Sequence, residues 1–201
     1  MTLEQTIEAA RQWLNFCNEL LDNQDSDSSN RGRITAGLLH LSMEHHSSIF
    51  LLTEKKHYGS AFALLRPQFE SFIRGIWFHL CSSDEQLDEF IKDEEPPKIN
   101  SLLKDLESVQ GYENGTLKTT KDEVWSALCG YTHGGYFQVA YRNTETEIAS
   151  DYDEEHLKGL LIMASNITLS TVVAFARLIN KDSVAIDAAS NHKEIFNGHM
   201  A

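Results

Sequence analysis

The segment Ser60–Cys81, with the sequence SAFALLRPQFESFIRGIWFHLC, decides the fold of this chain. Its large apolar residues recur at steps of three and four, which is the period of one face of an α-helix. These residues are Phe62, Leu65, Phe69, Phe72, Ile76 and Leu80. Ser60 is the expected N-cap. Because Pro67 lacks a backbone N–H and crowds the carbonyl of Ala63, we expect a kink near Ala63 or a helix that begins later.

Similar periods recur on both sides of this segment, and no strand-like alternation competes with them. Residues 34–56 carry apolar side chains on more than one face, which is typical of a helix at the centre of a bundle. The other expected helices lie at about residues 2–22, 84–91, 99–106, 120–133 and 153–178. The sequence therefore predicts an all-α, single-domain helical bundle of about five to seven helices over residues 1–182. Residues 183–201 are expected to form a partly ordered C-terminal tail.

The charge of the chain limits its partners. The 201 residues include 30 acids against 17 lysines and arginines, so the formal net charge is −13. An average surface of this charge repels phosphate backbones and anionic lipids. A cluster of arginines can still make a local positive pocket in an acidic protein. Any contact with nucleic acid is therefore expected to be local.

The cysteines and the hydropathy pattern indicate a compartment. Cys17, Cys81 and Cys129 are odd in number, widely separated and flanked by apolar residues, which is typical of buried free thiols. The sequence starts without a charged and apolar leader, and no uninterrupted apolar run approaches the length of a membrane span. We therefore expect a cytoplasmic protein that does not enter a membrane.

Arg66, Glu70 and Arg74 follow one another at intervals of four residues, so they fall on one stripe of the expected helix. The stripe predicts a continuous row of ion pairs. If the row is buried, its spare guanidinium donors make a pocket for a carboxylate, a phosphate or an acid of a partner protein. The row can equally serve only to hold neighbouring helices together, because structural ion-pair networks need no ligand.

A second polar cluster lies in Gly130–Tyr136, with the sequence GYTHGGY. Its adjacent glycines allow unusual backbone angles or a close approach to a ligand, and Tyr131, His133 and Tyr136 offer polar groups there. The segment is also compatible with a helix C-terminus that ends at glycine, with His133 near its negative end. The ligand-binding residues predicted from both clusters are Arg66, Glu70, Arg74, Tyr131 and Tyr136, with His133 beside them.

A metal site is a third possibility. His40, Glu44 and His45 lie within little more than one helical turn, and Glu54–His57 has the Glu-x-x-His spacing of di-metal carboxylate bundles. Such a site needs a second Glu-x-x-His motif and two further glutamates from other helices, and the sequence does not contain the second motif. The sequence also lacks a glycine-rich phosphate loop, a serine elbow and a paired-cysteine zinc motif. We therefore expect no metal and no cofactor, and keep a metal-binding bundle as a further alternative.

The segments Tyr58–Glu70 and Ile73–Trp77 resemble a group of bacterial all-helical proteins of unknown function, in which a Leu-x-Arg-Pro-x-Phe-Glu core recurs. In that group a histidine-rich helix precedes the core and a later His-Gly pair follows it, as His133 and Gly134 do here. Such proteins are similar to the HEPN superfamily (higher eukaryotes and prokaryotes nucleotide-binding), helical bundles that often dimerise. The superfamily includes metal-independent ribonucleases of toxin and phage-defence systems.

HEPN nucleases carry an arginine and a histidine separated by four to six residues, and these side chains from two subunits converge on the scissile phosphate. Here Arg74 and His79 match this spacing, and so do Arg33 and His40. The resemblance implies a homodimer that binds RNA or a nucleotide. It also implies catalytic roles for Arg74 and for a histidine, either His79 or His133.

The leading hypothesis is a HEPN-like bundle whose Arg/Glu/His pocket takes a phosphate-bearing ligand, as a metal-independent ribonuclease or toxin-type component of bacterial defence. The alternative is a non-enzymatic interaction module, the partner or neutraliser of another protein in a defence operon, in which the ion-paired row is only structural. The acidic composition and the lack of a complete catalytic motif favour this alternative.

Overall fold

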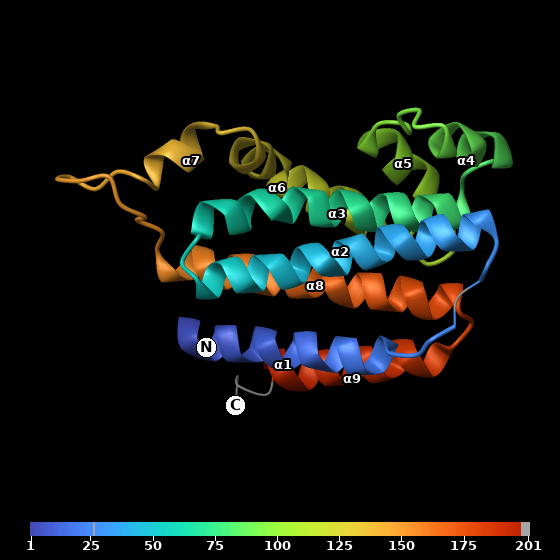
Figure 1. Cartoon of the computed structure of the whole chain (residues 1–201), viewed down its shortest axis with the longest axis horizontal. Helices are drawn as coiled ribbons and strands as arrows, with labels where there is room; N and C mark the ends of the chain where they lie inside the picture. The colour runs from blue at the N-terminus through green and yellow to red at the C-terminus, as the bar shows by residue number, and fades with distance from the viewer. Residues whose placement is uncertain (26, 198–201) are drawn as a thin grey trace.

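A computed structural model describes residues 1–25 and 27–197, and within these ranges it holds nine α-helices and no β-strand (Figure 1). They are α1 (Leu3–Leu21), α2 (Asn30–Glu54), α3 (Tyr58–Leu80), α4 (Asp84–Ile91), α5 (Ile99–Leu106), α6 (Thr116–Thr132), α7 (Tyr136–Ala140), α8 (Glu154–Leu178) and α9 (Asp182–Asn197). The predicted all-α class is confirmed. The described helices outnumber the expected five to seven because α7, with five residues, is too short to show a period and α9 lies in the expected tail.

Helices α1, α2, α3, α8 and α9 lie side by side and form one layer. Helices α4 to α7 form a second layer over α3 (Figure 1). The interface between α2 and α3 is the most extensive, and α8 packs against α1, α2, α3 and α9. On its other side α3 contacts α5 and α6. Helix α3 therefore joins the two layers, and side chains on its α6 side lie between them.

Burial on both sides explains the apolar composition of α3. Ile73, Trp77 and Phe78 are almost completely buried, and each such side chain contributes about 1.5–3 kcal/mol to folding. The indole N–H of Trp77 donates to Oδ2 of Asp105 in α5 at 2.9 Å. The amphipathic helix predicted from the sequence is therefore a central helix of the core.

Pro67 lies inside α3, and the helix runs through it. The helix begins at Tyr58, so it starts neither at an N-cap of Ser60 nor after the proline. Without an N–H at Pro67, the carbonyl of Ala63 lacks its usual helical donor. Oγ1 of Thr132 in α6 lies 3.4 Å from this carbonyl oxygen. The proline therefore exposes an acceptor at the place where α6 meets α3.

Helix α8 bears on the expectation that no uninterrupted apolar run approaches the length of a membrane span, and that expectation is not contradicted because Lys158 and Asn166 interrupt the apolar residues of the helix. By length and composition it is the one described helix that could cross a membrane. Its apolar character is not obvious from the sequence because Ser165, Thr168 and Thr171 interrupt the apolar run, although all three are buried. Since α8 contacts four other long helices, burial in the bundle also accounts for its composition, and a core helix has the same features.

Residues 182–197, most of which belong to the expected partly ordered tail, form α9, which packs against α1 and α8. Val184, Ala188 and His192 follow at intervals of four and are buried, and the ring of His192 lies edge-on to Trp13 with centroids 4.9 Å apart. Because this stripe consists of small and polar residues, it produces only a weak apolar period. Residues 198–201 of the expected tail lie outside the described residues.

The three cysteines are free thiols, as expected, but only one of them is buried. Cys17 is completely buried, whereas Cys81 and Cys129 are partly exposed. The expectation of burial is therefore wrong for Cys81 and Cys129. Leu80 and Cys81 both lie partly buried at the edge of the core, whereas Cys129 is partly exposed although the adjacent Leu128 is buried.

Candidate functional site

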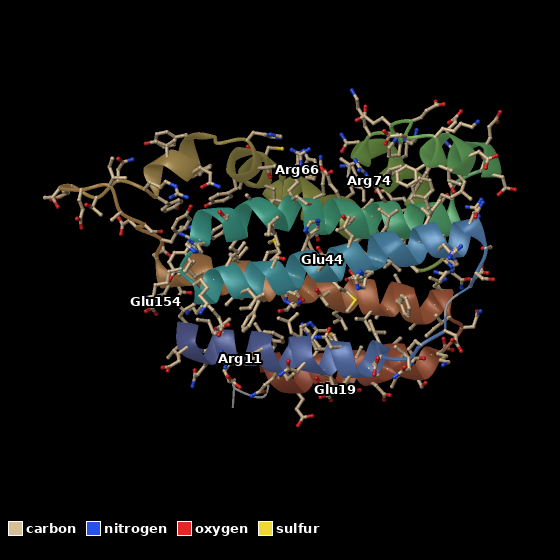
Figure 2. All side chains as sticks on the ribbon, viewed as in Figure 1. Arg11, Glu19, Glu44, Arg66, Arg74 and Glu154 are labelled. Carbon is tan, nitrogen blue, oxygen red and sulfur yellow. The ribbon has the colours of Figure 1, made fainter. Side chains whose placement is uncertain are left out.

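Two helical stripes of equal spacing meet between α3 and α6. On α3, Arg66, Glu70 and Arg74 share one face, and Figure 2 shows the two arginines along this helix. Nε of Arg66 donates to Oε1 of Glu70 at 2.7 Å. Nη2 of Arg74 lies 3.5 Å from Oε2 of the same carboxylate. The row of ion pairs is therefore present, with Glu70 between the two arginines.

The stripe on α6 consists of Trp125, Cys129 and the C-cap residue His133, and all three contact the guanidinium of Arg66. Nη1 of Arg66 lies 2.8 Å from Nε2 of His133 and 3.4 Å from Sγ of Cys129. The guanidinium carbon lies 4.7 Å from the centre of the Trp125 ring, as in a cation–π contact. Because arginine only donates, Nε2 of His133 is the acceptor. Arg66 therefore joins the two stripes.

The stripe on α3, together with His133 from the stripe on α6, lines a pocket of about 370 Å³, which we call the arginine pocket. Its lining residues are Leu41, His45, Arg66, Pro67, Glu70, Ser71, Arg74, Thr132 and His133. Burial lowers the pKa of His45, which comes from α2, below its usual value. Nε of Arg74 is buried and has no hydrogen-bond partner among the described residues. This N–H is therefore a donor that the described residues leave unpaired, and a ligand in the pocket reaches it only if the Arg74 side chain turns.

The arginine pocket is locally positive in an acidic chain, because two guanidinium groups share the single carboxylate of Glu70. The side chains of Arg66 and Arg74 are 23% and 35% exposed, so water screens their charges only in part. Guanidinium groups bind phosphate and carboxylate through charge-assisted hydrogen bonds. His133 is exposed at the rim, where its imidazole can form a hydrogen bond to a ligand. The arrangement can therefore bind one anionic group at the two arginines, next to the imidazole of His133.

Three other residues of the predicted site lie elsewhere. Tyr131 is buried, and burial raises the pKa of its hydroxyl to about 12. Tyr136 is 81% exposed at the start of α7. His79 follows Arg74 by five residues, which is about 140° around the helix, and its pKa is lowered by burial and then by the charge of Arg177. None of these three lines the arginine pocket.

Trp125, Cys129 and His45 belong to this site, but the sequence prediction of an anion pocket does not include them. The intervals of four residues that link Trp125 to Cys129 and Cys129 to His133 are a usable signal, because they mark one face of α6. His45 has no such signal, since its position depends on how α2 packs against α3.

The third possibility, a metal site, has no support in the geometry. His40 and Glu44 line a separate cavity of about 370 Å³ between α1, α2 and α8, whereas His45 lines the arginine pocket. Among the described residues, no three His, Cys, Asp or Glu side chains are grouped so that they could hold a metal ion. The three side chains proposed as ligands therefore do not converge.

Comparison with known proteins gives a family and no function. No curated protein and no solved structure matches the chain. The model of a family of unknown function, DUF6988, matches residues 39–200. This range includes every residue that lines the arginine pocket. The chain therefore belongs to DUF6988, a family of unknown function.

Proposed function

We propose that the arginine pocket binds a phosphate group of RNA or of a nucleotide. The observation that carries this proposal is the position of Arg66, whose guanidinium joins Glu70 to His133. Arg74 approaches the same carboxylate, and its Nε is buried without a partner among the described residues. Because the net charge is −13, affinity must come from this pocket and not from the average surface.

The same groups support a metal-independent cleavage of RNA. In this proposal Arg66 turns from Nε2 of His133 to the phosphate. The freed Nε2 then takes the proton of a ribose 2′-hydroxyl, whose oxygen attacks the adjacent phosphorus. Arg66 and Arg74 stabilise the negative charge of the phosphorane. The bond from phosphorus to the 5′-oxygen breaks, and water protonates the leaving oxygen. The products are a 2′,3′-cyclic phosphate and a free 5′-hydroxyl.

The likeness of Tyr58–Glu70 to a group of bacterial helical proteins, which are in turn similar to the HEPN superfamily, extends the proposal. HEPN-like ribonucleases act as dimers, so we propose a homodimer of cytoplasmic chains in a bacterial defence system. Arg74 and His79 lie on different sides of α3, so they cannot act together within one chain. The histidine that lies beside Arg66 and Arg74 in the same chain is His133. Sedimentation velocity at micromolar concentration tests the dimer, and a monomer would remove this part of the proposal.

The activity is tested with a 5′-fluorescein-labelled single-stranded RNA and purified protein in EDTA, which removes metal-dependent contaminants. We expect the wild type to leave 2′,3′-cyclic phosphate ends. Arg74→Ala and His133→Ala should be slower by about 10²-fold or more. Arg33→Ala and His40→Ala are matched controls, because both side chains are exposed on α2 and share the other Arg-x6-His spacing. Circular dichroism checks the fold of each variant.

Binding and cleavage are separated by the fluorescence polarisation of the same RNA. If the RNA binds and is never cut, the ribonuclease proposal fails and the phosphate pocket stands. If Arg66→Ala and Arg74→Ala bind the RNA as the wild type does, the phosphate pocket also fails.

One observation favours the alternative of a non-enzymatic interaction module. Glu70 lies within reach of both guanidinium groups, so part of their charge is already compensated inside the row. In this case the row holds α3 and α6 together, and the chain serves as the partner or neutraliser of another defence protein. Arg66→Ala would then lower the free energy of unfolding without any effect on RNA. Urea unfolding of this variant, beside the RNA assay, decides between the two functions.

A further inference from the structure

Another cavity, of about 340 Å³, lies between α3, α6, α7 and α8 and shares no lining residue with the arginine pocket. We call it the aromatic pocket. Phe62 and Leu65 of α3, Tyr131 of α6 and Met163 of α8 give it a mainly apolar lining. Its volume is in the range of small-molecule sites, about 300–1,000 Å³. The proposed function makes no use of this cavity.

Five aromatic rings stack in series along the aromatic pocket. The series runs from Phe137 through Tyr131, Phe62 and Tyr152 to Tyr141, with successive ring centres 6.2, 4.5, 5.2 and 4.8 Å apart. The angles between successive rings are 15–28°. Every ring except that of Tyr152 lines the pocket. Tyr131 and Phe62 each stack between two neighbours in the series, so they offer a ligand mainly their edges. Because aromatic rings also attract each other edge to face, such a wall favours a flat ring as its ligand.

One polar side chain in this lining is held by a carboxylate. Nδ1 of His156 lies 2.7 Å from Oδ2 of Asp153, the N-cap of α8. The backbone N–H of His156 donates to this carboxylate at 2.8 Å, and this bond keeps the pKa of Asp153 below its usual range. Among the described residues, none is hydrogen-bonded to Nε2 of His156. One ring nitrogen of an oriented imidazole is therefore free at the pocket.

Gly159 opens the wall that α8 contributes. A Cβ atom at this position would have no other atom within 4 Å. Gly159 also lines a neighbouring cavity of about 330 Å³, so the open space continues along α8. Glycine weakens a helix relative to alanine, and packing does not require it at a position with open space before it. A Cβ atom at Gly159 would therefore lie in open space where the two cavities adjoin.

We propose that the aromatic pocket binds a neutral, flat aromatic molecule that carries a hydroxyl group. The ring stack receives the flat ring, and Nε2 of His156 receives the hydroxyl. A hydroxyl fits either state of the imidazole, because it donates to the neutral ring and accepts from the protonated one. A carboxylate fits less well, since Asp153 and Glu155 lie at the same end of the pocket.

The probe for this proposal is 2-naphthol, titrated into the full-length chain by isothermal titration calorimetry. We expect saturable binding at one site per chain. Gly159→Met fills the pocket and should weaken binding by about tenfold or more. Gly37→Met is the matched control, because Gly37 lies exposed on α2 and a Cβ there also meets no atom within 4 Å. Both substitutions replace a helical glycine with a better helix former, so both variants should fold.

Naphthalene, which lacks the hydroxyl, tests the role of His156. We expect it to bind the wild type more weakly than 2-naphthol does, and His156→Ala to remove this difference while both molecules still bind. If 2-naphthol fails to saturate, or binds Gly159→Met as tightly as the wild type, the site does not exist as proposed. If His156→Ala leaves the preference for the hydroxyl unchanged, the assignment of His156 is overturned.

Discussion

Oγ1 of Thr132 lies 3.4 Å from the carbonyl oxygen of Ala63, the acceptor that Pro67 deprives of its helical donor. The same hydroxyl lies 2.8 Å from the carbonyl of Leu128 in its own helix, so one proton serves two acceptors. The next residue, His133, reaches Arg66. The break in the hydrogen bonding of α3 therefore coincides with the point where α6 supplies the histidine of the arginine pocket.

Replacing Pro67 tests how much the missing hydrogen bond in α3 lowers the free energy of unfolding. Pro67→Ala restores an N–H for Ala63, and we expect the free energy of unfolding to rise by up to about 3 kcal/mol, the difference between proline and alanine inside a helix. Urea unfolding measures the change. Pro96→Ala, in the segment between α4 and α5, is the control and should change stability little. A less stable Pro67→Ala would mean that the proline ring is required by its surroundings.

The hydroxyl of Thr132 gives a second test through a double-mutant cycle. Thr132→Val keeps the shape of the side chain and should lower the free energy of unfolding by about 1 kcal/mol, the net value of one hydrogen bond. In the Pro67→Ala background we expect a smaller loss, because Ala63 then has a donor within its own helix. Equal losses in both backgrounds would show that the hydroxyl serves only Leu128.

The buried His46 predicts a pH dependence of stability. Burial, and then the nearby His192, lower the pKa of His46 to about 3, against about 6.5 in the unfolded chain. The unfolded state therefore binds a proton first as the pH falls. The free energy of unfolding should be constant above pH about 6.5 and decrease below it, by up to about 1.4 kcal/mol per pH unit, until pH about 3.

Urea titrations at successive pH values measure this slope. His46→Met removes the buried imidazole and should flatten the curve between pH about 4 and 6.5. His40→Met is the matched control, since His40 is exposed on the same helix, and it should keep the slope. If His46→Met and the wild type show the same slope, other groups carry the pH dependence.

The cysteines should differ in their reactivity. Burial raises the pKa of Cys17 well above its usual value, so its thiolate is scarce and shielded. Ellman's reagent should therefore react with Cys81 and Cys129 in the folded chain and with Cys17 only after unfolding. In a Cys81→Ala variant, modification places a bulky group at Cys129 beside Arg66 and should weaken RNA binding. A fast reaction of Cys17 in the folded chain would show that α1 opens readily.

The row on α3 could be predicted because its cause is local: three residues at intervals of four share a helical face wherever the helix lies. The sequence predicted that Arg66 and His133 share a site, but it could not predict that they are in direct contact. The distance between the two side chains depends on how α6 packs against α3. Tyr131 and Tyr136 flank His133 in sequence, yet one is buried and the other exposed. Tyr131 lies on α6 on a different face from His133, and Tyr136 begins the next helix, α7. Proximity in sequence therefore does not give a common pocket.

The helix α9 and the aromatic pocket show what sequence periodicity misses. The buried face of α9 includes Ala188 and His192, which carry little apolar signal although they pack closely. The aromatic pocket needs rings from α3, α6 and the segment after α7, and no single period connects Phe62 with Tyr152. Such a site becomes visible only when the distances between helices are known.

Trp125 gives the arginine pocket an optical signal of its own. The chain has three tryptophans, of which Trp13 and Trp77 are fully buried. Trp125 instead lies against the guanidinium of Arg66, with Nζ of Lys121 5.3 Å from its ring centre. An anion that draws Arg66 away from the indole changes the electric field at this fluorophore and therefore its emission. A library of unlabelled nucleotides can thus be screened by intrinsic fluorescence, with Trp125→Phe as the silent reference.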